Sequence, residues 1–164
     1  MKTRLNSIID KMKSKNIERN EVVSLDDIKN FERKNKIELP KELVSFYTEI
    51  SNGCKMIDGF NLLKMEDWKF NSSKVDKDFL FTKYWIWEDD NDSENLKHIE
   101  DGNIELIDIG DSQTWNIIVS GKEKGKMWFF TDVGIQPCAP SMNFLELFEF
   151  WLDGNDDYFY DFQA

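Results

Sequence analysis

The apolar positions recur at three- and four-residue intervals in four segments, which is the spacing of an amphipathic helix that buries one face. The first segment places Leu5, Ile8, Ile9 and Met12 on one stripe. The corresponding stripes are Leu43, Phe46, Tyr47 and Ile50 in the third segment and Phe144, Leu147, Phe148, Trp151 and Leu152 in the last.

The second segment opens at Ser24, a residue type that caps helix N-termini by accepting a backbone hydrogen bond. The second helix is predicted to begin at Ser24 and to end near Asn35. The third has Pro40 as its first residue and ends at a left-handed turn formed by Asn52 and Gly53, and the last runs from near Ser141 to Asp153.

Between the third and last helices the pattern changes to short segments rich in aromatic and β-branched residues, which favour strands. The strongest are 115–119 and 126–131, and the polar, glycine-containing segment between them is typical of a hairpin turn. Weaker elements are predicted as well: strands at 54–58, 60–64 and 104–109, and one helical turn at 64–70.

Segment 79–87 fits either a helix or a strand, and its aromatic residues slightly favour a strand. Helices at both ends of the chain enclose the group of short strands. This order predicts the α+β class: a single domain with a mainly antiparallel (mixed) sheet packed against N-terminal helices and a C-terminal helix. A chain of 164 residues, 40% of them hydrophobic, is large enough to bury such a core without disulfides or a metal.

The charge of the chain is strongly negative and unevenly distributed. Acidic residues outnumber lysine and arginine by 32 to 21, which gives a formal net charge of -11. Residues 1–50 hold 11 basic and 9 acidic side chains, a net +2, and residues 51–164 hold 10 basic and 23 acidic ones, a net -13. Such a surface repels nucleic-acid phosphates and attracts a basic protein partner, although plain solubility is the simpler explanation of acidity alone.

The cysteines and the hydropathy pattern indicate a reduced, cytoplasmic setting. Cys54 and Cys138 have apolar or small neighbours and are predicted to be buried thiols, with no disulfide framework. The first residues lead into a segment broken by charges, without the apolar core of a secretion signal. No run approaches the roughly 18 apolar residues of a membrane-spanning helix.

The residue types that support catalysis or metal binding are scarce. His98 is the only histidine, and it lies in an acidic stretch without identifiable partners. Segment 90–94 resembles the start of a calcium-binding loop, but Asn95 replaces the glycine of its sixth place and Asp101 the glutamate of its twelfth. No zinc-ligand cluster, nucleophile elbow or phosphate-binding glycine loop occurs. The sequence predicts no catalytic residue, no metal site and no cofactor, and it disfavours an enzyme.

Two segments combine aromatic residues with clustered acids, which is the composition of a protein-binding surface. Seven acids occur between Glu88 and Asp101, directly after a Trp-Ile-Trp sequence, and the C-terminal segment repeats the combination. The alternatives are that both tryptophans belong to the core and that the aromatic tail folds back over the sheet. The predicted partner-binding residues are Trp85, Trp87, Glu88, Asp89, Asp90, Asp92 and Glu94, followed by Asp156, Asp157 and Tyr158.

Several short motifs occur in an order that identifies a family. They are IKNFE at 28–32, IELPKEL at 37–43, FY at 46–47, SNG at 51–53, GKMWF at 125–129 and SMNFLEL at 141–147. In this order they resemble the SUKH superfamily, which includes bacterial toxin-immunity proteins and homologues of a yeast regulator of cell-wall synthesis. The resemblance spans about residues 24–154, its LP and NG positions are the most specific, and residues 65–112 carry no match.

The resemblance implies a compact α+β fold with a mixed sheet packed against helices. It also implies one domain over residues 1–164, with 1–23 as a variable N-terminal helical extension and 155–164 as an acidic aromatic tail. Bacterial members are commonly immunity proteins that bind and neutralise a toxin domain, often a nuclease. The matched residues explain the fold and not the binding, so no binding residue is carried over from the family.

Together these observations give the hypothesis of a non-enzymatic immunity protein that binds a cognate toxin and occludes its active surface. A basic nuclease domain fits the negative charge, because charge complementarity steers association. The hypothesis includes no direct contact with nucleic acid or with a membrane, and it leaves the oligomeric state open. The alternative is a regulatory scaffold or a small-ligand-binding domain, which a deep apolar pocket with polar groups would favour.

Overall fold

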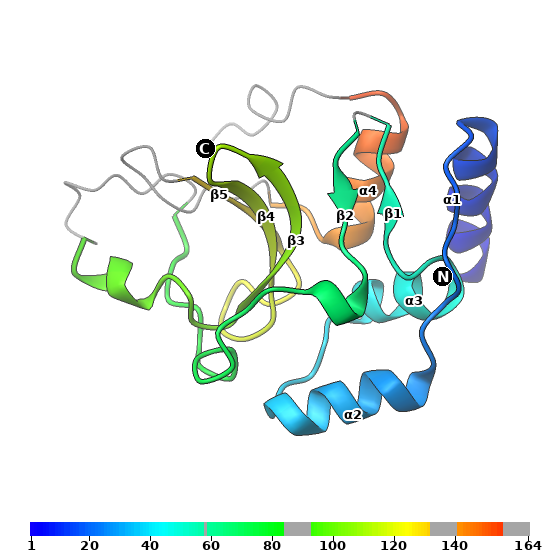
Figure 1. Cartoon of the computed structure of the whole chain (residues 1–164). Helices are drawn as coiled ribbons and strands as arrows, with labels where there is room; N and C mark the ends of the chain where they lie inside the picture. The colour runs from blue at the N-terminus through cyan, green and yellow to red at the C-terminus, as the bar shows by residue number, and fades with distance from the viewer. Residues whose placement is uncertain (58, 84–92, 132–140, 156–164) are drawn as a thin grey trace.

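The structure is a computed structural model, and it describes residues 1–57, 59–83, 93–131 and 141–155. Three helices precede a group of strands, and a fourth helix follows it (Figure 1). The helices are α1 (Lys2–Ser14), α2 (Leu25–Asn35), α3 (Lys41–Glu49) and α4 (Phe144–Leu152). The strands are β1 (Cys54–Lys55), β2 (Asn61–Leu62), β3 (Asn103–Gly110), β4 (Gln113–Ile118) and β5 (Met127–Phe130), with 3-10 turns η1 (Met65–Asp67) and η2 (Ser93–His98) between β2 and β3.

The strands form one five-stranded sheet in the order β1-β2-β3-β4-β5, and every neighbouring pair is antiparallel. The register of β3 against β4 shifts between Glu105 and Ile107 and again between Asp108 and Gly110, irregularities of the kind that increase the twist of a sheet. Helices α1, α3 and α4 contact one another, whereas α2 lies apart from them (Figure 1). The predicted α+β class, with a sheet packed against N-terminal helices and a C-terminal helix, is confirmed.

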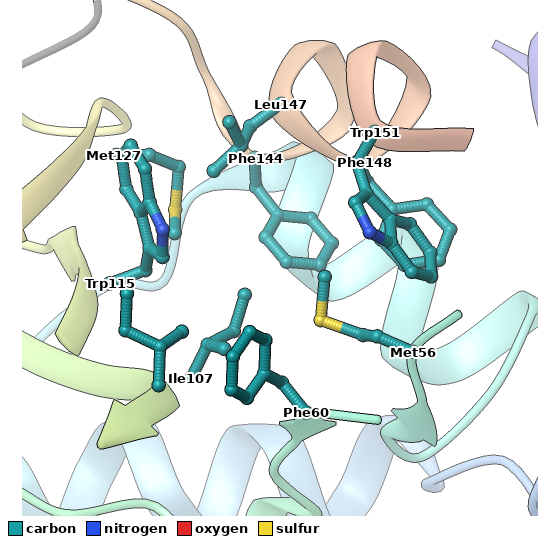
Figure 2. A pocket seen from close by; sticks show the side chains of 10 residues that line it. Met56, Phe60, Ile107, Trp115, Met127, Phe144, Leu147, Phe148 and Trp151 are labelled. Carbon is teal, nitrogen blue, oxygen red and sulfur yellow. The ribbon is translucent and has the colours of Figure 1, made fainter. Parts of the chain in front are cut away.

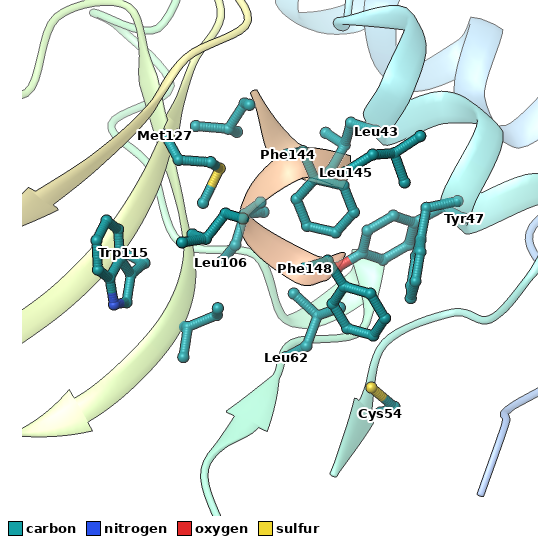
Figure 3. Packing of buried hydrophobic residues seen from close by; sticks show 14 of the residues in the cluster. Leu43, Tyr47, Cys54, Leu62, Leu106, Trp115, Met127, Phe144, Leu145 and Phe148 are labelled. Carbon is teal, nitrogen blue, oxygen red and sulfur yellow. The ribbon is translucent and has the colours of Figure 1, made fainter. Parts of the chain in front are cut away.

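The main core forms where α3 and α4 pack over the sheet. Phe46 of α3 contacts Phe144 and Phe148 of α4, with ring centroids 5.2 and 4.7 Å apart. Trp115 and Met127 belong to the same cluster and reach it from the strands (Figure 3). Aromatic pairs in such edge-to-face contacts add about 0.5–1.5 kcal/mol each beyond the area that they bury. The apolar stripes predicted for these helices are therefore the faces that form the core.

Helix α1 is also part of this core. Three residues of its predicted stripe, Leu5, Ile8 and Met12, are each at most 2% exposed, and the fourth, Ile9, is half-buried against the core. The Arg4 guanidinium donates to the Glu149 carboxylate of α4 over 2.6 Å, and this carboxylate raises the pKa of Arg4. The N-terminal helix is thus attached to the C-terminal helix by apolar packing and by an ion pair.

The other face of the sheet carries a second, smaller apolar cluster that the sequence pattern did not predict. Phe79 and Phe81 pack there against Ile118 of β4 and Trp128 of β5. The rings of Phe79 and Trp128 lie 4.9 Å apart and nearly perpendicular. Both faces of the sheet are consequently covered in part, which explains why β4 and β5 are buried along most of their length.

Segment 79–83, the described part of 79–87, forms neither a helix nor a strand. The backbone N–H of Phe79 donates to the Ser120 carbonyl over 3.1 Å, and Phe79 forms one isolated bridge with Gly121. The preference for a strand is therefore wrong here, because aromatic residues in this segment fill a cluster without extending the sheet. The remainder of the segment lies outside the described residues.

Two helix starts differ slightly from the prediction. Pro40 precedes α3 as its N-cap, with φ and ψ of -57° and 137°, and is not its first residue. Helix α4 begins after Asn143, not at Ser141. The Asn143 side chain accepts a hydrogen bond from the backbone N–H of Glu146, whose carboxylate accepts one from the backbone N–H of Asn143. This reciprocal capping box satisfies two backbone donors and fixes the start of the helix.

Gly53 has the left-handed conformation predicted for it, with a φ of 68°, although α3 already ends at Glu49. Its role is to let β1 begin close to the chain that leaves β2. A Cβ atom at this position would lie 2.5 Å from the carbonyl oxygen of Leu62 and 2.8 Å from that of Leu63. Since both obstacles are backbone atoms, a side chain is excluded by space as well as by φ.

We predict that Gly53→Ala destabilises the fold by about 3 kcal/mol or more, because it combines an unfavourable φ with a backbone clash. Gly110→Ala is the matched control, since Gly110 has a φ of 89° but nothing within 4 Å of its missing Cβ. The free energy of unfolding of this control variant should fall by only about 1 kcal/mol. Urea unfolding of the full chain measures both, and equal losses would show that the clash at Gly53 is relieved without cost.

Candidate partner-binding surface

The predicted partner-binding residues fall almost entirely outside the described part of the chain. Glu94 is the exception, because it belongs to η2, the 3-10 turn that precedes β3. Their assignment stays a prediction. The residues outside the described part are Trp85, Trp87, Glu88, Asp89, Asp90, Asp92, Asp156, Asp157 and Tyr158.

The first hollow in the described surface is an apolar pocket between the sheet and α4 (Figure 2). Phe144, Phe148 and Trp151 of α4 line one side, and Trp115 and Met127 of the strands line the other. The pocket has a volume of about 20 Å³, which is room for about one water molecule. All the side chains that line it are apolar, so it lacks the convergent polar groups of a ligand site. It therefore gives no support to the small-ligand alternative.

The second hollow is a polar groove of about 610 Å³ on the sheet face opposite the main core. The Thr114 hydroxyl donates to the Asn116 side-chain oxygen over 2.7 Å, and the Asn116 amide donates to the Asn103 side-chain oxygen over 2.8 Å. The Asn103 amide in turn donates to the carbonyl oxygens of Ile99 and Asp101. This chain of hydrogen bonds satisfies the buried amides and gives the groove a fixed polar floor.

The charged side chains around this groove already form ion pairs with one another. The Lys69 ammonium lies 2.9 Å from Glu105 and 3.5 Å from Asp108, and the Lys74 ammonium lies 3.0 Å from Glu100. The Glu105 carboxylate raises the pKa of Lys69, and the Lys74 ammonium lowers the pKa of Glu100. A charged partner would have to break these pairs, so the groove offers shape and hydrogen bonds more than free charge.

His98 lies at the edge of this region and is not solitary. Its Nδ1 atom is 3.0 Å from an oxygen of Asp101, whose side chain is buried. The second oxygen of Asp101 has no hydrogen-bond partner within the described part of the chain. Among the residues described, no three His, Cys, Asp or Glu side chains gather as ligands for a metal ion.

Cys54 is a buried free thiol, as predicted, and its burial raises the pKa of the thiol to about 12. The thiol is therefore protonated at neutral pH and is a poor nucleophile. Cys138 lies outside the described residues. In the parts of the chain that the structure describes, no helix combines the length and the apolar character needed to cross a membrane.

The third hollow, of about 690 Å³, is lined by residues of α2, of the segment before α2, and of η1, the turn that follows β2. Its floor is aromatic: the Phe31 ring lies 5.4 Å from Trp68 and 5.5 Å from Phe70, in edge-to-face contacts. The Trp68 indole N–H donates to the Tyr47 hydroxyl over 3.2 Å, and this hydroxyl donates to the Leu63 carbonyl over 2.6 Å. Buried hydrogen bonds thus hold the floor in place below the rings.

Asn52 fixes the two walls of this third groove. Its side-chain oxygen accepts a hydrogen bond from the backbone N–H of Met65 over 2.8 Å, and its amide donates to the Glu66 carboxylate over 2.9 Å. Its backbone carbonyl accepts from the Asn20 amide over 3.0 Å, and the Asn20 backbone N–H donates to the Ser51 hydroxyl. Both the segment before α2 and the turn after β2 are therefore held by the SNG motif.

This role of the SNG motif was not predicted, because the motif was expected only to end the third helix. The available signal was the polar Asn52 between two apolar segments, where an amide with four hydrogen-bonding sites needs partners. The hydrogen bond from Asn52 also lowers the pKa of Glu66, so this carboxylate stays ionised below its ordinary range.

The fold and the order of its motifs together define the class of protein, an α+β domain with a helical layer on one face of an antiparallel sheet. The model of the SMI1/KNR4 family (SUKH-1) matches residues 22–149, more than three quarters of the chain. The chain belongs to the SMI1/KNR4 family, which confirms the predicted resemblance to the SUKH superfamily. No curated protein and no solved structure gives a significant match.

We predict that Asn52→Ala raises the pKa of Glu66 toward its ordinary value and destabilises the fold by about 1–2 kcal/mol, through loss of two hydrogen bonds. Because the pKa of Glu66 is lowered in the folded wild type, its ionised carboxylate adds to the free energy of unfolding above about pH 4–5, the ordinary range of a glutamate. This contribution is lost as the pH falls. The variant should therefore lose less stability than the wild type on acidification. Carbon-13 NMR titration of Glu66 and urea unfolding at several pH values measure the two effects.

The exposed Asn6 of α1 provides the control, because Asn6→Ala removes the same side chain far from the groove. It should leave the pKa of Glu66 unchanged. An unchanged Glu66 titration in Asn52→Ala as well would contradict the role assigned to the Asn52 amide.

Proposed function

We propose that this chain is an immunity protein that binds and neutralises a cognate bacterial toxin. The observation that carries the proposal is membership of the SMI1/KNR4 family, since the SUKH group includes toxin immunity proteins. The charge supports it, because the net -13 of residues 51–164 favours a basic partner. Neutralisation in this proposal is achieved by binding and needs no catalytic residue.

The mechanism is occlusion of the toxin's active surface. A nuclease is the class of toxin that fits best, since it must present positive charge to nucleic-acid phosphates. Acids at the rim of the interface accelerate association by steering, and aromatic anchors at its centre slow dissociation. In this proposal the tryptophans at 85 and 87 are the anchors, and the acids at 88–94 and 156–157 are the steering charges.

The polar groove on the sheet adjoins this predicted surface along the chain. Glu94 lies in η2, and η2 leads within a few residues to Glu100 and Asn103, which line the groove. The floor of Thr114, Asn116 and Asn103 is held by its own hydrogen bonds, so it gives a rigid surface to a partner that lands beside the acidic segment. We propose that this groove forms the ordered part of the interface.

Co-expression with the toxin encoded beside this gene tests the proposal. We expect cells that produce the toxin to survive when this chain is present and to die when it is absent. Purified chain and toxin should form a stoichiometric complex, detected by size-exclusion chromatography, in which the toxin's activity is lost. Equal killing with and without this chain would refute the proposed function.

The acidic segment is tested separately by its effect on association. Replacing Asp89, Asp90 and Asp92 with asparagine should slow association with the toxin by about tenfold at low salt, and the difference should shrink as salt rises. The matched control changes the same amount of charge elsewhere, through Asp10→Asn, Glu18→Gln and Asp111→Asn, all at exposed positions. Stopped-flow mixing measures the association rates of both triple variants with the toxin. Equal rates for the two would remove the segment from the interface.

A further inference from the structure

Among the residues that the structure describes, the carboxylates that line the groove between α2 and η1 are not engaged in ion pairs, unlike those around the polar groove on the sheet. Glu21, Asp27 and Glu66 line it, together with one lysine, Lys64. Within the described part of the chain these three carboxylates form no ion pair, and the side-chain hydrogen bonds that Asp27 and Glu66 accept come from neutral groups. Besides the Asn52 hydrogen bond, the charge of Lys64 contributes to the lowered pKa of Glu66, but three carboxylates face this one ammonium, so the groove keeps an excess of negative charge.

Aromatic rings lie at the bottom of this charged rim. Trp68 is 7% exposed, and Phe31 and Phe70 are half-buried, so parts of the two phenylalanine rings remain accessible in the groove. The faces of aromatic rings attract cations, and the attraction strengthens when the cation leaves bulk water. Rings below carboxylates provide the two kinds of contact that a cationic side chain with an apolar stem needs.

A single metal ion does not fit this arrangement. The three carboxylates come from separate elements: Glu21 precedes α2, Asp27 lies in its first turn, and Glu66 lies in η1. No group of three acids close enough to share a metal ion occurs among the described residues. The cation that matches this rim must be larger and must present several donors in different directions.

Two large apolar side chains are exposed close in sequence to the acids of this groove. Val22, which lines it, is 43% exposed, and Leu25 in the first turn of α2 is 60% exposed. Large apolar side chains exposed beside a charged hollow are typical of a surface that another protein covers. This observation favours a cationic side chain carried on a protein segment with an apolar neighbour.

We infer that the groove between α2 and η1 receives an arginine side chain from a protein partner, with an apolar residue beside it covering Val22 and Leu25. The guanidinium stacks against the aromatic floor and donates to Glu66 and Glu21 at the rim. Arginine fits better than lysine, because its planar group stacks on rings and donates several hydrogen bonds at once. The inference deepens the proposed function, since on that function the arginine belongs to the toxin.

The walls are organised in advance for this contact. Asn52 holds one oxygen of Glu66, which leaves the other oxygen for a partner, and Asn20 anchors the chain that carries Glu21. A preorganised site loses less conformational freedom on binding than a flexible one. Asn52 is therefore a positioning residue for the groove.

The test uses short peptides with the full-length chain: acetyl-Leu-Arg-Leu-amide, and the same peptide with citrulline in place of arginine. Citrulline has nearly the shape of arginine but no charge. Nitrogen-15 NMR titration should show millimolar binding of the arginine peptide, with shifts confined to residues 20–31 and 64–70, and binding of the citrulline peptide at least about fivefold weaker. Equal binding of both peptides, or shifts elsewhere on the chain, would overturn the inference.

Variants locate the contact at the rim. The double variant Glu21→Gln and Glu66→Gln should weaken binding of the arginine peptide by at least about fivefold. The control, Asp10→Asn and Asp111→Asn, changes the same charge at exposed positions that do not line the groove and should weaken binding less than twofold. Thermal unfolding confirms that all variants are folded. If both double variants weaken binding equally, the peptide is attracted by the net charge of the chain and not by this groove, and the inference is refuted.

The same variants separate this inference from the proposed function. If the chain protects cells from the toxin and the groove double variant protects and binds the arginine peptide equally well, the inference fails and the immunity function stands. If the chain binds the arginine peptide through the rim but protects against no toxin, the immunity function fails and the arginine site stands.

Discussion

The turn at Ser51-Asn52-Gly53 is the constraint on which the helical layer, the sheet and the third groove all depend. Gly53 lets the chain leave α3 and pass within contact of the Leu62 and Leu63 carbonyls, a path that no side chain permits. Asn52 then connects this path to residues 20 and 65–66 through hydrogen bonds. Because one turn sets all these distances, a change there alters the fold and the candidate surface together.

The two faces of the sheet are covered in different ways. On one face Phe46, Phe144 and Phe148 pack between the helices and the strands. On the other, an apolar cluster around Phe79 covers only part of the surface and leaves the polar floor around Asn116 open. A fully apolar second face would need further helices to cover it, whereas a hydrogen-bonded polar floor tolerates both water and a partner.

Elements that bury one face of a helix or strand were predictable, because burial imposes a period on the sequence. The apolar stripes of α1 and α4 illustrate this. Ser24 was predictable for another reason, because serine is a preferred N-cap residue. The groove between α2 and η1 was not predictable, because its parts come from segments some 40 positions apart that meet only in the fold, through the Asn52 hydrogen bonds and the ring contacts of Phe31 with Trp68 and Phe70. The acidic segment at 88–94 is recognisable by composition alone, yet composition does not say which face it joins.

The net charge of this chain acts over a longer distance than the contacts within the groove between α2 and η1. The two features therefore contribute differently to recognition. The net -13 of residues 51–164 acts over about a Debye length, roughly 8 Å at physiological salt, and attracts any basic protein. It raises association rates without distinguishing one cationic partner from another. Selectivity requires contacts that depend on shape, such as a planar cation between Glu66 and the Phe31 ring. On the proposed function, charge would bring the toxin and this chain together, and the groove proposed for an arginine would add the selectivity that charge alone does not provide.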